Sequence, residues 1–141
     1  MVGGGEDEKA LRHLATKLNC AQQVIFEGDL REARAHYFNC DIIAHPSRWE
    51  GCSYALLEAM AAGRAIIASD AGGNPEVLGD TGVVIKETNP AVWASEIIAL
   101  ARDDNKRQTL SFATLERATN QFPLRKMVDR TLTVYERVTT R

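Results

Sequence analysis

Short apolar runs alternate with stretches of helical periodicity along most of the chain. Between the runs, apolar spacing predicts a helix within residues 6–19 and a shorter helix that ends at Gly63. The runs themselves are rich in β-branched residues and indicate buried parallel strands at positions 24–26, 41–44, 65–68 and 82–85. This alternation predicts an α/β fold, with a parallel sheet that has helices on both faces.

The pattern becomes entirely helical after the last of these strands. Pro90 is placed to begin a helix, a second helix is predicted within 104–120, and Pro123 can begin a third. Trp93 and Tyr135 are expected to pack in the core. The apolar stripe of the third helix consists of Leu124, Val128, Leu132 and Tyr135. Together these patterns predict a Rossmann-like sheet flanked by helices, followed by a helical C-terminal segment.

Composition narrows the class of protein. A length of 141 residues predicts one domain, and the 45% hydrophobic and 26% charged residues are ordinary for a globular chain. The net charge of −2 gives no support for a nucleic-acid partner. No apolar run has the length of a membrane span, and the N-terminus lacks the pattern of a secretory signal. Cys20, Cys40 and Cys52 fit neither a disulfide framework nor a zinc site, which favours the cytoplasm.

The stretch from residue 45 to residue 60 follows a strand and leads into a helix. It therefore lies at the carboxyl edge of the sheet, where open α/β sheets bind ligands. The turn Gly51-Cys52-Ser53 precedes the helix, whose first amide groups have no partner within the helix. Such amides favour a phosphate or diphosphate. Ser53 alone has a simpler interpretation, because serine is an ordinary N-cap residue.

Two glutamates flank this helix N-terminus. Glu50 precedes the turn, and Glu58 lies in the otherwise apolar run 56–62. A carboxylate in so apolar a helix is costly unless it accepts hydrogen bonds, and the paired hydroxyls of a ribose or another sugar are good donors. A bond from Glu58 to nearby backbone or to an arginine would also satisfy it, and the spacing alone leaves both interpretations open.

A second loop, at residues 71–76, follows the next strand at the same edge of the sheet. Its glycines allow a close approach of the backbone, and Pro75 is placed to begin a short helix. A tight turn without a ligand would need the same residues. This loop therefore gives only weak evidence for a site.

These motifs, in this order, resemble the C-terminal domain of the glycosyltransferase family 4 enzymes, which have the GT-B fold. The family pattern is Pro-Ser after a strand, Glu-Gly, a second Glu eight residues after the first, Ala-Met-Ala-x-Gly, and then Gly-Gly-x-Pro-Glu-Val. The corresponding segments here are Pro46-Ser47, Glu50-Gly51, Glu58-Ala59-Met60-Ala61-Ala62-Gly63 and Gly72-Gly73-Asn74-Pro75-Glu76-Val77. The likeness extends more loosely from Val2 to about Val138.

The resemblance implies a retaining transfer of a sugar from a nucleotide-diphosphate donor, without a metal or another cofactor. Glu50 would contact hydroxyls of the transferred sugar as the catalytic residue, and Glu58 would bind the ribose. The donor-binding loop would comprise Gly51, Cys52, Ser53, Tyr54, Ala55 and Leu56, whose backbone amides from Cys52 onward face the sugar and diphosphate. The acceptor, whether a sugar, a glycan or a lipid, is not defined. The expected location is the cytoplasm, and the full-length enzyme could act there at the inner surface of the membrane.

The chain departs from the family in two respects. Cys52-Ser53 stands where the family commonly has Phe-Gly, which narrows the conformations open to the loop. The family's acceptor-binding N-terminal domain, and the first strand and helix of the C-terminal domain, have no counterpart, so residues 1–141 are predicted to be a donor-binding domain truncated at its N-terminus. That missing strand lies between the strands equivalent to 1–4 and 41–44. Without it, these two segments must pair directly, leave a gap or accept a strand from another molecule. Because an open position invites association, a homodimer of the fragment is one expectation.

Two other functions remain as alternatives. A non-catalytic module would keep the nucleotide-sugar pocket without performing transfer, and a GT-B sugar-nucleotide epimerase would share the fold. The pairing of Glu50 and Glu58 with Gly72-Gly73 follows the transferase pattern more closely. A Rossmann dehydrogenase is disfavoured because no G-x-G-x-x-G follows a strand and begins a helix.

Overall fold

The computed structural model describes residues 1–139, which divide into two compact units, Met1–Ala35 and the chain from His36 onward. The first unit contains α1 (Glu8–Lys17) and the short 3-10 helix η1 (Ala21–Gln23), and α2 (Arg34–Tyr37) spans the boundary. The second unit contains β1 (Ile42–His45), α3 (Tyr54–Ala61), β2 (Ala65–Ser69), α4 (Asn74–Leu78), β3 (Val83–Ile85), α5 (Pro90–Arg102), α6 (Asp104–Gln121) and α7 (Leu124–Thr139).

The sheet of the second unit is parallel, in the order β1-β2-β3. His45 of β1 lies opposite Ala68 of β2, and Ile67 of β2 lies opposite Val83 of β3. The predicted strands at 65–68 and 82–85 are confirmed. The strand predicted at 41–44 lies one residue later, because His45 continues the pairing. All three strands therefore end at one edge of the sheet, where the loops into α3 and α4 begin.

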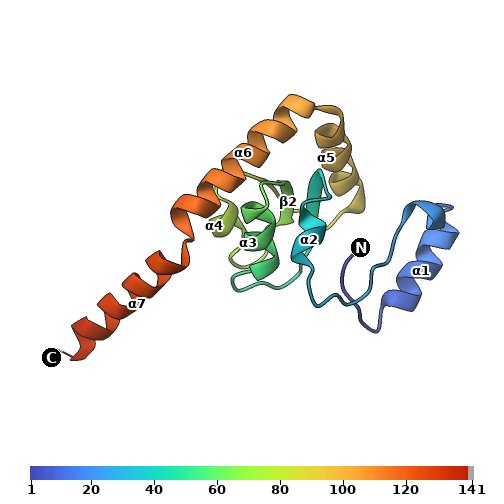
Figure 1. Cartoon of the computed structure of the whole chain (residues 1–141). Helices are drawn as coiled ribbons and strands as arrows, with labels where there is room; N and C mark the ends of the chain where they lie inside the picture. Colours follow the sequence, from blue (N-terminus) through green and yellow to red (C-terminus); the bar gives the residue numbers. More distant parts are fainter. Residues whose placement is uncertain (140–141) are drawn as a thin grey trace. The chain divides into compact units, whose positions relative to one another are not determined.

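Alternation along the strands divides the apolar residues between two layers. Ile66 and Ala68 of β2 face α3 and α4, where Leu56, Met60 and Leu78 are completely buried. The residues between them on β2, Ala65 and Ile67, face the other way and pack with Leu100 of α5 and Leu110 of α6. The helices on the two faces confirm the predicted α/β architecture, and Figure 1 shows α3, α4 and α5 around β2.

The predicted strand at 24–26 is wrong. In the first unit the backbone pairing consists of one isolated parallel bridge, between Val2 and Gly28, flanked by hydrogen bonds from the Glu27 amide to the Met1 carbonyl and from the Gly3 amide to the Gly28 carbonyl. Met1–Gly3 offers too short a partner for a strand, because the extended backbone ends at Gly3, which has a φ of +119°. The side chain of Ile25 is accordingly exposed.

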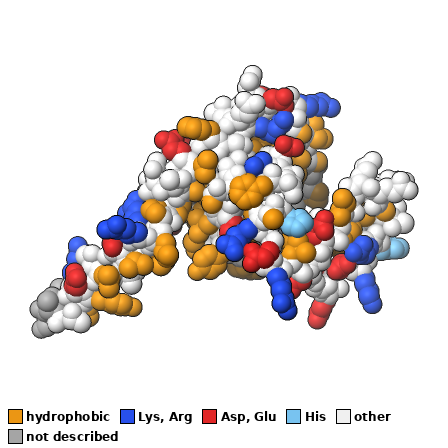
Figure 2. All heavy atoms as spheres, in the orientation of Figure 1, with side chains coloured by type: hydrophobic (Ala, Val, Ile, Leu, Met, Phe, Trp, Pro, Cys, Tyr) orange, Lys and Arg blue, Asp and Glu red, His pale blue; other side chains and the backbone are white. Residues whose placement is uncertain are grey.

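The C-terminal helices agree with the sequence in position but not in burial. α5 begins at Pro90 as predicted, and Trp93 packs against the buried residues of its face of the sheet. The third helix forms as α7, but Tyr135 does not pack in the core, since 64% of it is exposed. Its neighbours Leu124 and Leu132 are exposed as well, and apolar side chains line α7 in Figure 2. Within residues 1–139, no helix combines the length and apolar character needed to cross a membrane.

Candidate functional site at the carboxyl edge of the sheet

The loops that leave β1 and β2 meet at the carboxyl edge of the sheet. A cavity of about 330 Å³ opens there, lined by residues that follow all three strands and by Trp93 of α5. Ser47 and Arg48 come from the first loop, and Asp70 and Ala71 come from the second. The sequence placed its candidate site at this edge, and both loops lie beside one another as expected for parallel strands.

The N-terminus of α3 is capped by Ser53. Its side-chain oxygen accepts the Leu56 amide at 3.4 Å, so the simpler interpretation of this serine is confirmed. The cap occupies one amide of the loop. Within residues 1–139, the amides of Cys52, Ser53, Tyr54 and Ala55 donate to no acceptor. These four amides therefore stay available at the positive end of the helix, which favours an anion.

The Glu50 carboxylate is held by two side chains from its own loop and strand. The Ser47 hydroxyl donates to Glu50 Oε1 at 2.6 Å, and His45 Nε2 lies 2.9 Å from the same oxygen. The hydrogen bond from Ser47, with the hydrogen bond and charge of His45, holds the pKa of Glu50 below its ordinary value, although desolvation opposes them. Glu50 is therefore ionised at neutral pH. The two contacts make it a hydrogen-bond acceptor held in one orientation.

Glu58 has a different environment in the second turn of α3. Among the described residues its carboxylate has no hydrogen-bond or ion-pair partner, and its oxygens are not sealed from solvent. The bond to backbone or arginine that the sequence left open is therefore absent from residues 1–139. Burial of the phenol, and then the negative charge of Glu58, raise the pKa of Tyr37 above its ordinary value. Glu58 is a half-buried acceptor that lacks a donor.

The second loop supports the first through its backbone. Gly72 has a φ of +50°, and a Cβ atom there would lie 1.5 Å from the Glu50 carbonyl oxygen. A Cβ atom on Gly73 would lie 2.1 Å from the Gly51 carbonyl oxygen. Each glycine thus lets the second loop pack directly beneath the loop that carries Glu50. The simpler explanation for these glycines, tight packing of the chain, accounts for them fully.

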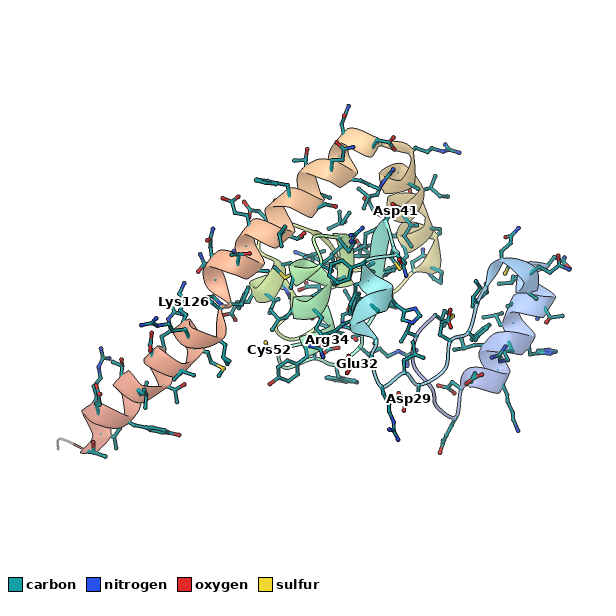
Figure 3. All side chains as sticks on the ribbon, in the orientation of Figure 1. Asp29, Glu32, Arg34, Asp41, Cys52 and Lys126 are labelled. Atoms are coloured by element: carbon teal, nitrogen blue, oxygen red, sulfur yellow. The ribbon has the colours of Figure 1, made fainter. Side chains whose placement is uncertain are left out.

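The remaining residues of the predicted site are distributed around the α3 N-terminus. Gly51 and Cys52 are exposed, and Figure 3 marks Cys52 in the loop that enters α3. Tyr54 is 81% exposed, whereas the Leu56 side chain is completely buried. Leu56 therefore belongs to the core and has its amide engaged by Ser53. No group of three or more residues within 1–139 is arranged to hold a metal ion.

Sequence reasoning missed two residues of this region, His45 and Tyr37. His45 ends β1 and contacts Glu50. No pattern in the sequence assigned a role to this histidine or to Tyr37. The signal available for His45 was its position on the strand, just before a loop that returns a carboxylate to the same edge. Tyr37 belongs to α2, which is too short for hydrophobic periodicity to reveal.

The fold agrees with the comparison with known proteins. The family model described as "Glycosyl transferases group 1" matches residues 1–117. The chain therefore belongs to the group 1 glycosyl transferase family, and the resemblance seen in the sequence is confirmed.

Several relatives extend this match over most of the chain. A GDP-mannose-dependent α-(1-6)-phosphatidylinositol monomannoside mannosyltransferase of Mycobacterium tuberculosis is 32% identical over 133 residues, which is 86% of this chain and 34% of that protein. A D-inositol 3-phosphate glycosyltransferase of Corynebacterium diphtheriae is 35% identical over 86 residues, covering 60% of this chain and 20% of that protein. The chain thus spans between 20% and 34% of the length of these two relatives.

Solved structures show the same GT-B relationship. HepE of Anabaena, in complex with UDP and glucose, has a TM-score of 0.84 and 26% identity, and the match covers 94% of this chain and 40% of HepE. The C-terminal domain of a group 1 family protein of Francisella tularensis has a TM-score of 0.75 and 26% identity, with 83% of this chain and 63% of that chain covered. The sheet and helices are therefore those of a GT-B C-terminal domain.

Proposed function

We propose that this chain is the donor-binding half of a retaining glycosyltransferase that uses a nucleotide-diphosphate sugar. The observation that carries the proposal is Glu58, a carboxylate to which no described residue donates a hydrogen bond. It lies on α3, the helix whose N-terminus presents four free amides. A helix N-terminus supplies donors for a diphosphate, and the neighbouring carboxylate supplies an acceptor for hydroxyls. A nucleoside diphosphate combines both chemistries in one molecule. The relatives named for GDP-mannose and the complex with UDP support this class of donor.

Each part of the site takes one part of the donor. Glu58 accepts the ribose hydroxyls, the amides of residues 52–55 bind the diphosphate, and Glu50 accepts hydroxyls of the transferred sugar. During transfer the bond between the anomeric carbon and the diphosphate breaks, and its electron pair stays on the diphosphate. The acceptor hydroxyl oxygen bonds to that carbon, and its proton passes to the departing diphosphate. The amides at the α3 N-terminus stabilise the negative charge that develops there.

The finer features of the proposal concern conditions and assembly. The positive end of α3 replaces a metal ion, the anomeric configuration is retained, and transfer takes place in the cytoplasm.

In the described part of the chain no strand pairs with the outer edge of β1, so that edge offers free backbone groups to a second copy. Light scattering across a concentration series is expected to show a monomer–dimer equilibrium. A constant monomer mass at high concentration would contradict the dimer.

A pair of glutamate variants tests the donor assignment. If Glu58 accepts ribose hydroxyls, Glu58→Gln loses a charged hydrogen bond worth roughly 1.5–3 kcal/mol, so affinity for UDP or GDP falls about 10- to 150-fold. Glu50→Gln is expected to lower the affinity for UDP-glucose or GDP-mannose and to leave the affinity for UDP and GDP almost unchanged. The measurement is calorimetric titration. Addition of EDTA is expected to leave the affinities unchanged, because the proposed site needs no metal ion.

The control is Glu116→Gln, which changes an exposed glutamate on α6. It is expected to leave both titrations and the melting temperature unchanged. A Glu58→Gln protein that binds diphosphates normally and melts early would show that Glu58 serves the fold instead of the ribose. If UDP, GDP and their sugars all fail to bind the unsubstituted chain, the proposed donor class is wrong.

A further inference from the structure

His45, to which the donor assignment gives no role, lies at the centre of a cluster of polar side chains. Its Nε2 atom is 2.9 Å from Glu50 Oε1, 3.1 Å from the Ser47 hydroxyl and 3.1 Å from the Ser53 hydroxyl. The side chains of His45 and Glu50 are 18% and 19% exposed, so water competes little with their contact. An ionised carboxylate only accepts hydrogen bonds, so Nε2 carries a hydrogen and donates to Glu50.

Both contacts to Glu50 fall on the same carboxylate oxygen. The Ser47 hydroxyl and His45 Nε2 each reach Oε1, and among the described residues no group donates to Oε2. Oε2 is also not sealed from solvent. Holding one oxygen fixes the direction of the other, so the pair of contacts presents Oε2 as a single oriented acceptor. The Glu50 side chain loses its rotational freedom before any ligand arrives, which lowers the entropic cost of binding.

The imidazole is itself placed by a rigid element. His45 is the last residue of β1 and pairs with Ala68 of the central strand. The Ser69 hydroxyl at the end of β2 donates to the Ser47 carbonyl at 2.5 Å and lies 3.4 Å from the His45 carbonyl. The start of the first loop is therefore fixed to the sheet. A side chain on a strand end positions a site more accurately than one on a free loop.

The same imidazole also contacts the residue that caps α3. Ser53 accepts the Leu56 amide and lies beside His45 Nε2, so the imidazole stands between the Glu50 carboxylate and the α3 N-cap. In the proposed donor complex these two groups face the sugar and the diphosphate. One side chain thus fixes the spacing between the two parts of the site that must hold the donor on either side of the bond that breaks.

We propose that His45 is a positioning residue that orients Glu50 toward the transferred sugar and ties it to the N-terminus of α3. The inference rests on the proposed function for the identity of the ligand. His45 acts through Glu50, so its removal weakens recognition of the sugar more than recognition of the nucleoside diphosphate. Its role depends on a donor at the position of Nε2 and not on the aromatic ring.

Three substitutions at this position separate the role from simple packing. His45→Gln places an amide nitrogen the same number of bonds from Cα as Nε2, whereas the amide of His45→Asn is too short to reach Glu50. His45→Leu fills the space without a donor. Titration with UDP-glucose and GDP-mannose is expected to show about tenfold weaker binding for the leucine and asparagine variants, with affinity for UDP and GDP changed by less than about twofold. His45→Gln is expected to restore most of the loss.

A double-mutant cycle tests whether His45 acts through Glu50. In a Glu50→Gln chain, His45→Leu is expected to cause no further loss of nucleotide-sugar affinity. Equal losses for the sugar and the bare diphosphate, or full additivity in the double variant, would overturn the inference and leave the proposed function intact. His13→Leu, at an exposed histidine of α1, is the control for loss of an imidazole.

A measurement without ligand covers the case in which no donor binds. The carboxyl resonance of Glu50, followed by NMR during an acid titration, is expected to move to higher pH in His45→Leu and to return toward the original value in His45→Gln. An unchanged Glu50 titration in all three variants would show that the imidazole does not hold the carboxylate. Failure of the donor to bind the unsubstituted chain, with the Glu50 resonance still shifted, would overturn only the proposed function.

Discussion

The two loops at the carboxyl edge of the sheet use their residues in opposite ways. The loop from β1 to α3 carries a connected set of side chains, in which Ser47 and His45 hold Glu50. The loop from β2 to α4 contributes mainly backbone, through Gly72 and Gly73, which pack on the carbonyl groups of the first loop. One loop thus carries the interacting polar side chains, and the other provides the backbone surface against which that loop packs. A glycine motif therefore says little about ligand contact unless its neighbours in the structure are known.

The largest expected effect comes from placing a side chain between the two loops. Gly72→Ala introduces a Cβ atom 1.5 Å from the Glu50 carbonyl oxygen at a residue with φ +50°, so the loops must separate. We expect a loss of about 3 kcal/mol or more in the free energy of unfolding, together with loss of donor binding. Denaturant unfolding and calorimetric titration measure the two effects.

Gly51→Ala is the matched control in the other loop. A Cβ atom there has no atom within 4 Å, and Gly51 is not among the glycines with positive φ. Its unfolding free energy is expected to change by less than about 0.5 kcal/mol. If Gly72→Ala unfolds like the Gly51→Ala protein, the second loop does not support the first in the way proposed.

A smaller effect is expected from Arg117, which binds the helix that follows the second loop. Arg117 of α6 donates from Nε to the Val77 carbonyl and from Nη2 to the Glu76 carbonyl, each at 2.8 Å. These carbonyls belong to α4, the helix that follows the glycine loop. Arg117→Ala leaves them without their charged donor and is expected to cost about 1–3 kcal/mol in unfolding free energy. The change in UDP or GDP affinity is expected to be smaller than that caused by Glu58→Gln.

Arg125 of α7 provides the control for loss of a guanidinium. Its side chain is 93% exposed and lies 3.8 Å from Asp129. Exposed ion pairs contribute little, so Arg125→Ala is expected to change the unfolding free energy by less than about 0.5 kcal/mol. Equal unfolding curves for the two arginine variants would argue that α6 does not brace the second loop.

Much of the fold could be predicted because its signals are local. The strands at 65–68 and 82–85 are continuous apolar runs, which buried parallel strands require on both faces. Gly63, with a φ of +63°, ends α3 where the sequence placed the end of that helix. The position of the candidate site could also be predicted, because the stretch that carries the two glutamates follows a predicted strand and leads into a predicted helix, which places it at the carboxyl edge of the sheet.

The predictions that were wrong or missing depend on the tertiary neighbours of a segment, which its own sequence does not specify. Residues 24–26 have the composition of a strand, but only Met1–Gly3 pairs with the stretch that follows them, through a single bridge. Tyr135 lies on an amphipathic helix, and amphipathicity predicts an apolar face without predicting that anything covers it. The contact of His45 with Glu50 depends on how the loop turns back, and no periodicity encodes that path. Pairing, coverage and loop geometry are therefore the parts that the sequence did not reveal.

The smallest expected effect sharpens the comparison through the charge that only the first loop carries. The hydrogen bond from Ser47 lowers the pKa of Glu50 in the folded protein, so ionised Glu50 stabilises the fold above its ordinary pKa, about 4.3. That stabilisation is lost as the pH falls through the lowered pKa of the folded state. Ser47→Ala brings the pKa of Glu50 back toward its ordinary value, so the variant loses less stability on acidification than the unsubstituted chain. Urea unfolding at a series of pH values measures the slope. In a Glu50→Gln chain no carboxyl remains to titrate, and Ser47→Ala is expected to leave the slope unchanged. A slope that Ser47→Ala changes equally in both chains would assign the effect to another carboxyl group and show that the charge of Glu50 does not stabilise the first loop.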